Sequence, residues 1–204
     1  DVGGSLLLAR APGRIGEYLG TTGHRMAAGD AIFAGFADYY LAEDEWPVLI
    51  RRLEDTGDWT AIDQAATPAP DSALAADQSL IDAHFGGETF RDILSALCAT
   101  DSEWSRRTLE RLSSPAPLAM AATVELIHRA RMRDRIEDAL QSEYRFAHRV
   151  AAQGDFREGI RAAIIERDKS PAWAHDAIDG ATPAEVAAML MPLGEDELKL
   201  EDAT

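Results

Sequence analysis

Apolar residues recur at helical spacing over most of the chain. Phe90, Ile93, Leu94 and Leu97 fall on one face of a helix behind Thr89, a residue type that caps helix N-termini well. Comparable patterns, bounded by capping residues, glycines and prolines, predict a succession of helices. The predicted ranges are 5–10, 14–22, 30–33, 43–54, 58–66, 73–84, 89–98, 101–112, 114–132, 134–153, 155–168 and 182–190.

Polar residues are expected to begin many of these helices, because their side chains accept hydrogen bonds from the first backbone amides. Thr182 with Pro183 and Glu185 forms a capping box, and Asp155 with Glu158 is a variant of it. The other predicted caps are Ser5, Asp30, Asp101, Ser114 followed by Pro115, and Asp134.

The two helices after residue 134 carry clear apolar stripes, which predict the faces that they bury. The stripe of the first consists of Ile136, Leu140, Tyr144, Ala147 and Ala151. The stripe of the second consists of Phe156, Ile160, Ala163 and Ile164.

Only residues 36–41, which include Tyr39 and Tyr40, favour a short strand. Pro68 and Pro70 predict a loop or linker over residues 66–71. The pattern as a whole therefore predicts a mainly α chain.

Composition narrows the class of protein. The 204 residues include 36 acidic and 20 basic side chains, which gives a net charge of −16. Such a charge disfavours binding to nucleic acid and to anionic membranes. The single cysteine, Cys98, excludes an intrachain disulfide, and no apolar run approaches the length of a membrane span. We expect a soluble, intracellular, globular protein, although the chain begins at Asp1 and a preceding segment stays possible.

The common catalytic motifs are missing. The five histidines, at positions 24, 84, 128, 148 and 175, include no pair at the i, i+4 spacing of a helical metal site. The sequence contains no serine-hydrolase elbow, phosphate loop or dinucleotide fingerprint. We therefore expect no metal site, structural or surface roles for the histidines, and a buried inert thiol at Cys98.

Arginines at alternate positions from Arg129 to Arg135 resemble an anion site, but alternate residues fan around a helix. They converge only if the helix breaks, and Asp134 offers such a break. A salt-bridged surface is the simpler interpretation.

Asp1 has the most unusual setting of the acidic residues. It precedes Val2, Gly3 and Gly4, just ahead of a predicted helix start. Glycines allow close approach of the backbone to a ligand, amides at a helix start bind negative charge, and an acid can position water or take a proton.

Several segments, in order and at the expected separations, resemble the 3-hydroxyisobutyryl-CoA hydrolases, a branch of the enoyl-CoA hydratase/isomerase (crotonase) superfamily. The segments are Asp1-Val2-Gly3-Gly4, residues 20–25, residues 30–37, residues 114–126, Glu143-Tyr144-Arg145, residues 155–162 and residues 168–173. The chain departs from the family pattern at Leu6-Leu7-Leu8, at Tyr39 and at Ala116, which leaves the acyl group open.

The resemblance implies that residues 1–42 end a crotonase-type α/β spiral core and that residues 43–204 form a C-terminal helical region. The chain would then be the C-terminal portion of the family's fold. The rest of the core, with the oxyanion amides and a catalytic glutamate, would lie upstream, either in the same polypeptide or in a separate one.

The resemblance also implies hydrolysis of 3-hydroxyisobutyryl-CoA, an intermediate of valine breakdown, to the free acid and coenzyme A. Asp1 would be catalytic, and Gly3 and Gly4 would bind substrate. Coenzyme A is part of the substrate, so no cofactor is expected. A bacterial cytoplasmic homo-oligomer is expected.

Two alternatives stay open at this point. One is an enoyl-CoA hydratase or isomerase, which would release no free thiol. The other is a non-catalytic helical module kept for assembly.

Overall fold

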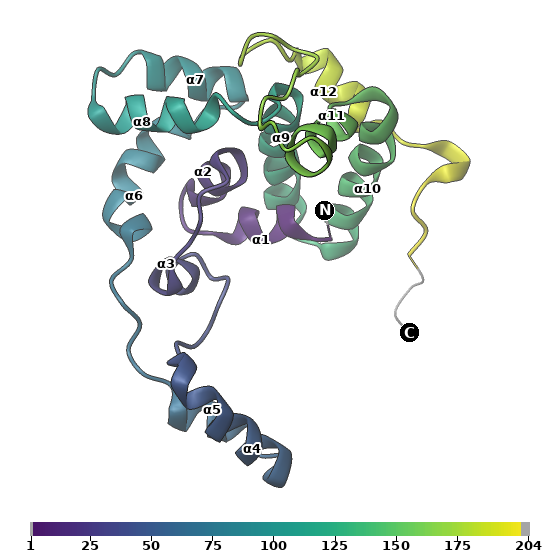
Figure 1. The fold of residues 1–204 in the computed structure, drawn as a ribbon. Coiled ribbons are helices and arrows are strands. Elements are labelled where there is room, and N and C mark those ends of the chain that lie inside the picture. The colour runs from purple at the N-terminus through teal and green to yellow at the C-terminus, as the bar shows by residue number, and fades with distance from the viewer. Residues whose placement is uncertain (1, 201–204) are drawn as a thin grey trace. The chain divides into compact units, whose positions relative to one another are not determined.

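The computed structural model describes residues 2–200, which are mostly helical (Figure 1). The chain divides into two compact units. The first contains the residues up to His24 and those from Leu80 onward, and the second contains Arg25–Ser79. Helix α6 (Ala73–His84) contributes residues to both.

The first unit begins with two short helices, α1 (Gly4–Arg10) and α2 (Ile15–Thr22). Their backbones approach so closely at Gly16 that a Cβ on this residue would lie only 2.0 Å from the carbonyl oxygen of Leu8. Gly23 ends α2 in the left-handed conformation, with φ of 59°, as predicted. The predicted cap at Ser5 is wrong, since α1 begins after Gly3 and Ser5 lies inside the helix.

Helix α9 (Pro117–Arg133) is the centre of the first unit and contacts α1, α2, α7, α10 and α12 (Figure 1). Its buried residues include Leu118, Val124 and Ile127, which lie on different sides of the helix. A helix that is apolar on most of its circumference is stable only when neighbours surround it. The hydrophobic core therefore gathers around α9, with Leu6 and Ala9 of α1 at one place and Val186, Met189 and Leu190 at another.

The remaining helices of this unit follow the predicted ranges within a few residues. They are α7 (Phe90–Cys98), α8 (Glu103–Leu112), α10 (Ile136–Gln153), α11 (Phe156–Ile160), a π-helical turn η2 (Arg161–Ile165), α12 (Pro183–Met189) and the 3₁₀ turn η3 (Gly194–Asp196). The capping boxes of Thr89 with Asp92 and of Thr182 with Glu185 are both present. The predicted box of Thr182 is thereby confirmed.

Other predicted caps are displaced. Ser102 rather than Asp101 caps α8, and Ala116 with Pro117 rather than Ser114 with Pro115 begins α9. Asp134 ends α9 in a left-handed conformation, with φ of 47°, and does not begin α10.

The predicted buried stripe of α10 is also wrong by one position. Ala139 and Glu143 are the buried residues of this helix, whereas Tyr144, Ala147 and Ala151 are exposed. The register of the buried face is set by contacts with α1 and α9, which the periodicity of α10 alone does not contain.

The predicted buried stripe of α11 and η2 is wrong as well. Phe156 is 55% and Ile164 62% exposed, and only Ala162 of this segment is buried. Phe156, Ile160 and Ile164 line a groove instead.

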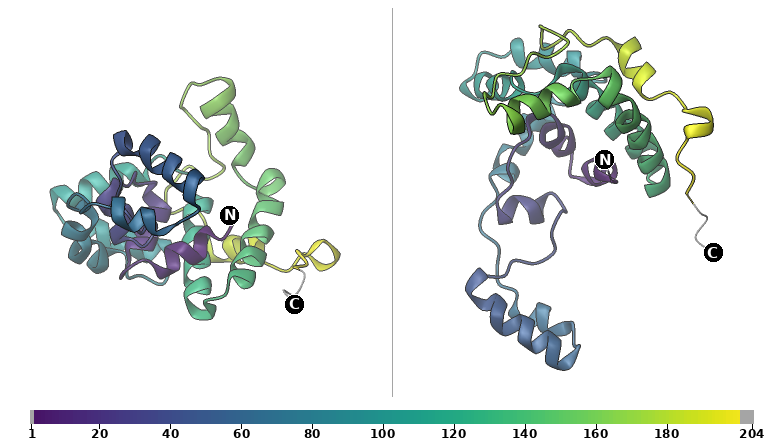
Figure 2. Two further views of the ribbon diagram at one scale, coloured as in Figure 1. Left: turned by 90° about the horizontal axis from the view of Figure 1, so that it is seen from below. Right: turned by 45° about the vertical axis from the view of Figure 1, so that its right-hand side comes forward.

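The second unit contains α3 (Ala28–Phe33), the 3₁₀ turn η1 (Glu43–Glu45), α4 (Trp46–Thr56) and α5 (Thr60–Ala65), followed by the predicted loop and the start of α6. Helices α4 and α5 lie side by side (Figure 2). Asp30 is buried but does not cap α3 as the N-cap. It is the third helical residue and accepts hydrogen bonds from Ala27 N, Ser72 Oγ and Leu74 N.

The predicted strand over residues 36–41 is wrong. Within residues 2–200 the structure contains no strand, only an isolated antiparallel bridge between Tyr40 and Thr67. The predicted division at residue 42 lies inside the second unit. That division separates the end of the family's core from the helical region, whereas the two units are defined by contacts within the chain, so it stays a prediction.

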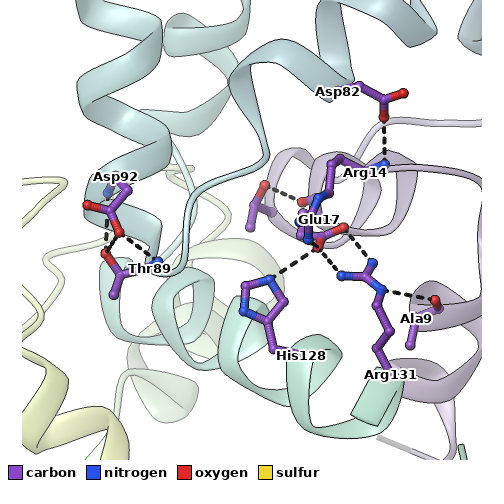
Figure 3. A network of polar contacts seen from close by, with 9 residues as sticks. Ala9, Arg14, Glu17, Asp82, Thr89, Asp92, His128 and Arg131 are labelled. Atoms are coloured by element: carbon purple, nitrogen blue, oxygen red, sulfur yellow. Dashed lines mark hydrogen bonds and ion pairs between the residues drawn. The ribbon is translucent and has the colours of Figure 1, made fainter.

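A buried carboxylate joins α2 to α9. Glu17 is fully buried, and its two oxygens accept hydrogen bonds from Arg131 at 2.6 and 3.0 Å (Figure 3). Arg14 Nη1 lies 3.0 Å and His128 Nε2 3.2 Å from the same carboxylate. Removal of this charge from water is costly, so its hydrogen bonds must compensate.

Two opposing effects set the pKa of Glu17. Burial raises the pKa of the carboxyl, but hydrogen bonds from His128 and Arg131 outweigh burial and lower it from 4.5 to about 2. Because the pKa is depressed in the folded state, the ionised carboxylate stabilises the fold above pH 4.5. This contribution is lost as the pH falls from about 4.5 toward about 2.

We predict that Glu17→Gln removes this pH dependence. The contribution amounts to about 3 kcal/mol, since the pKa falls from 4.5 to about 2 and each unit is worth about 1.4 kcal/mol. Urea unfolding followed by circular dichroism, from neutral pH to about pH 3, measures it. The variant should be less stable than the wild type at neutral pH, and the difference should shrink as the pH falls.

Glu125→Gln is the matched control. Glu125 pairs with Arg129 on the half-exposed side of α9, so its loss should cost at most about 1 kcal/mol. Parallel loss of stability by the wild type and Glu17→Gln on acidification would contradict the prediction.

Candidate functional site

The glycine segment at the start of the chain has an unusual backbone. Asp1 lies outside the described residues. Val2 and Gly3 both have left-handed φ angles, of 51° and 88°. A side chain at Gly3 would be strained, because φ is left-handed there and the Cβ would also lie 2.7 Å from Cδ1 of Ile136. Gly4 begins α1, and a Cβ there would meet open space.

A single buried carboxylate on α10 holds this segment. Glu143 is 3% exposed. Its Oε2 accepts a hydrogen bond from Gly3 N at 2.7 Å, and its Oε1 accepts one from Ser5 N at 2.8 Å and another from Ser5 Oγ. The first amides of α1 have no partner within the helix and carry partial positive charge, so a carboxylate is well suited to them. Glu143 thus fixes the backbone directly after the predicted catalytic residue.

This arrangement bears on the predicted substrate-binding glycines. The amide of Gly3 is engaged by Glu143, while the side of Gly4 where a Cβ would stand is open. Their role in substrate binding stays a prediction.

A groove borders the same carboxylate. It has a volume of about 530 Å³ and lies among α9, α10, α11 and the segment that ends at Trp173. Its lining is mostly apolar, with Leu118, Phe146, Val150 and Phe156 among its residues. Glu143 and Asp155 are the two acids that line it.

Residues 158–173, a few of which line the groove, are cross-linked through one guanidinium. Arg161 donates to Glu158, Glu166, Asp168 and the carbonyl oxygen of Ser170. The hydrogen bond from Arg161 lowers the pKa of Glu158 from 4.5 to about 2. At the end of the segment, Trp173 Nε1 donates to the carbonyl oxygen of Ser114 at 3.0 Å.

Sequence reasoning gave Glu143 no role beyond its place in a family motif. Glu143 lies four residues after buried Ala139, a spacing that places both on one face of the helix, but the predicted stripe was one position off. Asp155 was predicted to cap α11 through its side chain, and this is wrong. It precedes the helix without a capping bond, and its Oδ1 accepts from Ala174 N at 2.7 Å.

The histidines and Cys98 lie apart from this groove. His84 is buried and lies 2.7 Å from the carbonyl oxygen of Leu80, while His128 contacts Glu17. Within residues 2–200, no cluster of three or more His, Cys, Asp or Glu could hold a metal ion. The prediction that Cys98 is buried is wrong, because its side chain is exposed.

The arginines from Arg129 to Arg135 do not converge. Arg131 binds Glu17, and the others pair with Glu125, Asp138 and Glu137. The predicted salt-bridged surface is therefore confirmed for all but the buried pair of Arg131. No helix among the described residues has the length and apolarity that crossing a bilayer requires.

Comparison with known proteins finds relatives over the whole chain. The chain is 29% identical over its full length to the small ribosomal subunit protein mS47 of Arabidopsis thaliana. It is 27% identical over 98% of its length to the mitochondrial 3-hydroxyisobutyryl-CoA hydrolase of Dictyostelium discoideum. A crystal structure of an enoyl-CoA hydratase from Rhodobacter sphaeroides is 48% identical and superimposes with a TM-score of 0.88 over 98% of the chain.

The chain spans only part of each relative: 54% of the plant protein, 55% of the hydrolase and 58% of the hydratase. These values give a share and not a position, so they do not support the prediction that the chain is the C-terminal portion of the fold.

The sequence profile of one family, described as Enoyl-CoA hydratase/isomerase, matches residues 1–190. Together with the hydratase structure, which is nearly half identical over almost the whole chain, this match agrees with the resemblance carried by the glycine segment and the residues around Glu143. The chain belongs to the enoyl-CoA hydratase/isomerase family, within the crotonase superfamily of enzymes that act on coenzyme A thioesters.

Proposed function

We propose that this chain takes part in the hydrolysis of an acyl-CoA thioester, with 3-hydroxyisobutyryl-CoA as the substrate. The observation that carries the proposal is the Glu143 clamp on Gly3 and Ser5, because it immobilises the backbone next to the residue that the resemblance makes catalytic. Similarity to the Dictyostelium hydrolase over 98% of the chain supports the reaction type.

In the proposed reaction, water attacks the thioester carbonyl, a C–O bond forms, the C–S bond breaks, and the departing sulfur receives a proton. By resemblance, Asp1 is one member of the acidic pair that moves these protons, a contribution of roughly 10²–10⁴ in rate. By the same resemblance, its partner glutamate and the oxyanion amides would belong to a part of the family fold that the chain does not span. We also propose a cytoplasmic homo-oligomer.

Two other functions have specific support. Similarity to the Rhodobacter hydratase favours addition of water to an enoyl-CoA, which releases no thiol. Similarity to a ribosomal subunit protein favours a structural role.

We predict that the 204-residue chain by itself releases no thiol from 3-hydroxyisobutyryl-CoA above the uncatalysed rate. The test uses two preparations: the isolated chain, and the protein purified through a C-terminal tag on the native gene with any polypeptide joined or bound to it. A thiol reagent follows the release of coenzyme A. The native preparation should hydrolyse the thioester, and Asp1→Asn should lower its rate by roughly 10²–10⁴.

Each other outcome points elsewhere. Turnover by the isolated chain would contradict the prediction. Hydration of crotonyl-CoA by the native preparation without thiol release would replace hydrolase by hydratase, and inactivity on both substrates would favour the structural role.

We predict that Glu143→Gln in the native preparation lowers kcat by on the order of 10², with a smaller effect on KM. A glutamine has one acceptor oxygen, so it cannot bind both Gly3 N and Ser5 N as the carboxylate does. Steady-state kinetics measure the split between kcat and KM.

Glu137→Gln, at an exposed ion pair on the same helix, is the control and should leave kcat unchanged. If Glu143→Gln does not fold, Ser5→Ala removes only the hydroxyl bond to the clamp and should give a smaller drop in the same direction. If either variant folds and keeps the wild-type kcat, the positioning role of Glu143 is refuted.

A further inference from the structure

Two of the alternate arginines share one face of α9. Arg129 and Arg133 are four residues apart, so their side chains are neighbours on the helix surface. The chain reverses at left-handed Asp134, and α10 returns beside α9 (Figure 1). Between the two helices lies a hollow of about 200 Å³, the arginine hollow. Its polar lining residues are Arg129, Arg133, Asp138, Ser142 and Arg145.

The arginine hollow carries positive charge in a strongly acidic protein. Three guanidinium groups and one carboxylate, that of Asp138, line it, whereas the whole chain has a net charge of −16. Arg129 pairs with Glu125 and Arg145 with Glu197, but neither glutamate lines the hollow. The lining therefore attracts an anion rather than a cation.

Each guanidinium group keeps hydrogen-bond donors that no group among residues 2–200 uses. Arg129 and Arg145 donate only through Nε, each at 2.7 Å to its glutamate. Arg133 donates only through Nη1, over 3.4 Å to Asp138. A guanidinium group has five N–H donors in a planar fork, which fits the oxygens of a phosphate group or a carboxylate. The ion pairs of the surface thus leave most of these donors to a ligand.

The number of donors favours a phosphate group over a carboxylate. A phosphate group presents three strong acceptor oxygens, so each of three guanidinium groups binds its own oxygen, whereas a carboxylate has two. Buried Ala130 and Ala139 also line the hollow and are too small to fill the space between the helices. The remaining volume is several times the roughly 30 Å³ of one water molecule and accommodates a phosphate group.

We propose that the arginine hollow is a binding site for a phosphate group, either free inorganic phosphate or a phosphate of a small molecule. The phosphate oxygens accept hydrogen bonds from Arg129 and Arg133 of α9, from Arg145 of α10 and from the Ser142 hydroxyl. The bound anion joins the two helices and offsets the repulsion between the three guanidinium groups. The site does not depend on the proposed hydrolysis, because the hollow shares only Leu126 with the apolar groove.

The test measures phosphate binding directly. Inorganic phosphate is titrated into the native preparation used for the thiol-release assay, and isothermal titration calorimetry gives the affinity. Sodium chloride holds the ionic strength constant, because salt screens exposed charges. We expect saturable binding with a Kd of about 1 mM or lower.

Arg133→Gln tests the site against a closely matched control. It should weaken phosphate binding about 10-fold or more, as for a hydrogen bond to a charged group. Arg135→Gln removes the same charge two residues away. Arg133 is 68% exposed and lies 3.4 Å from Asp138, and Arg135 is 67% exposed and lies 3.5 Å from Glu137. Because Arg135 does not line the hollow, its loss should leave the affinity nearly unchanged.

Two further variants keep the test decisive if Arg133→Gln does not fold. Arg129→Gln should also weaken binding about 10-fold or more, and Ser142→Ala should give a smaller loss. Absence of saturable binding, equal losses in Arg133→Gln and Arg135→Gln, or full affinity in both Arg129→Gln and Arg133→Gln would each overturn the inference.

A competition arm identifies the source of the phosphate once the variants have established the site. Coenzyme A and dephospho-coenzyme A differ by one phosphate monoester. Displacement of inorganic phosphate by coenzyme A alone would support a phosphate monoester as the ligand. Displacement by both compounds would support the diphosphate that they share, and displacement by neither would support free phosphate.

Discussion

The contact between Glu143 and the first turn of α1 is the constraint on which the candidate site depends. The turn has amides that no helical carbonyl can reach, and its backbone takes two left-handed residues in a row. One buried carboxylate satisfies two of these amides and a hydroxyl. Without this contact, the charge of Glu143 on α10 and the first amides of α1 would both be buried without a hydrogen-bond partner from the other helix. The geometry of the glycine segment therefore belongs to α10 as much as to the segment itself.

A second buried carboxylate supports the first from the other side of α1. Glu17 ties α2 to α9, and Arg131 extends past it toward the carbonyl oxygen of Ala9 at the end of α1. In both cases, a buried charge has several directional hydrogen-bond partners. A charge with directional partners restricts the relative rotation of the helices in a way that leucines do not. We attribute the orientation of α1 to these two residues together.

Local sequence signals predicted the helices well and the site poorly. Thr89 was recognised as a cap from its residue type and Thr182 from its capping box, and both signals are complete within four residues. Tyr39 and Tyr40 suggested a strand, but no second strand is present among the described residues to pair with them. Glu143 and Asp155 could not be assigned, since the hydrogen-bond donors to both carboxylates lie in other segments of the chain. The family resemblance identified the segment around Asp1, and the profile match to residues 1–190 confirmed the family but not the role.

The hydrogen bond from Gly3 to Glu143 joins residues 140 positions apart. Closing so long a loop costs conformational entropy that only a largely assembled structure repays. During synthesis, Gly3 leaves the ribosome 140 residues before Glu143. The first turn of α1 must therefore wait for α10 before it takes its final geometry. The segment next to the predicted catalytic residue therefore reaches its final geometry only in a chain in which α10 has folded.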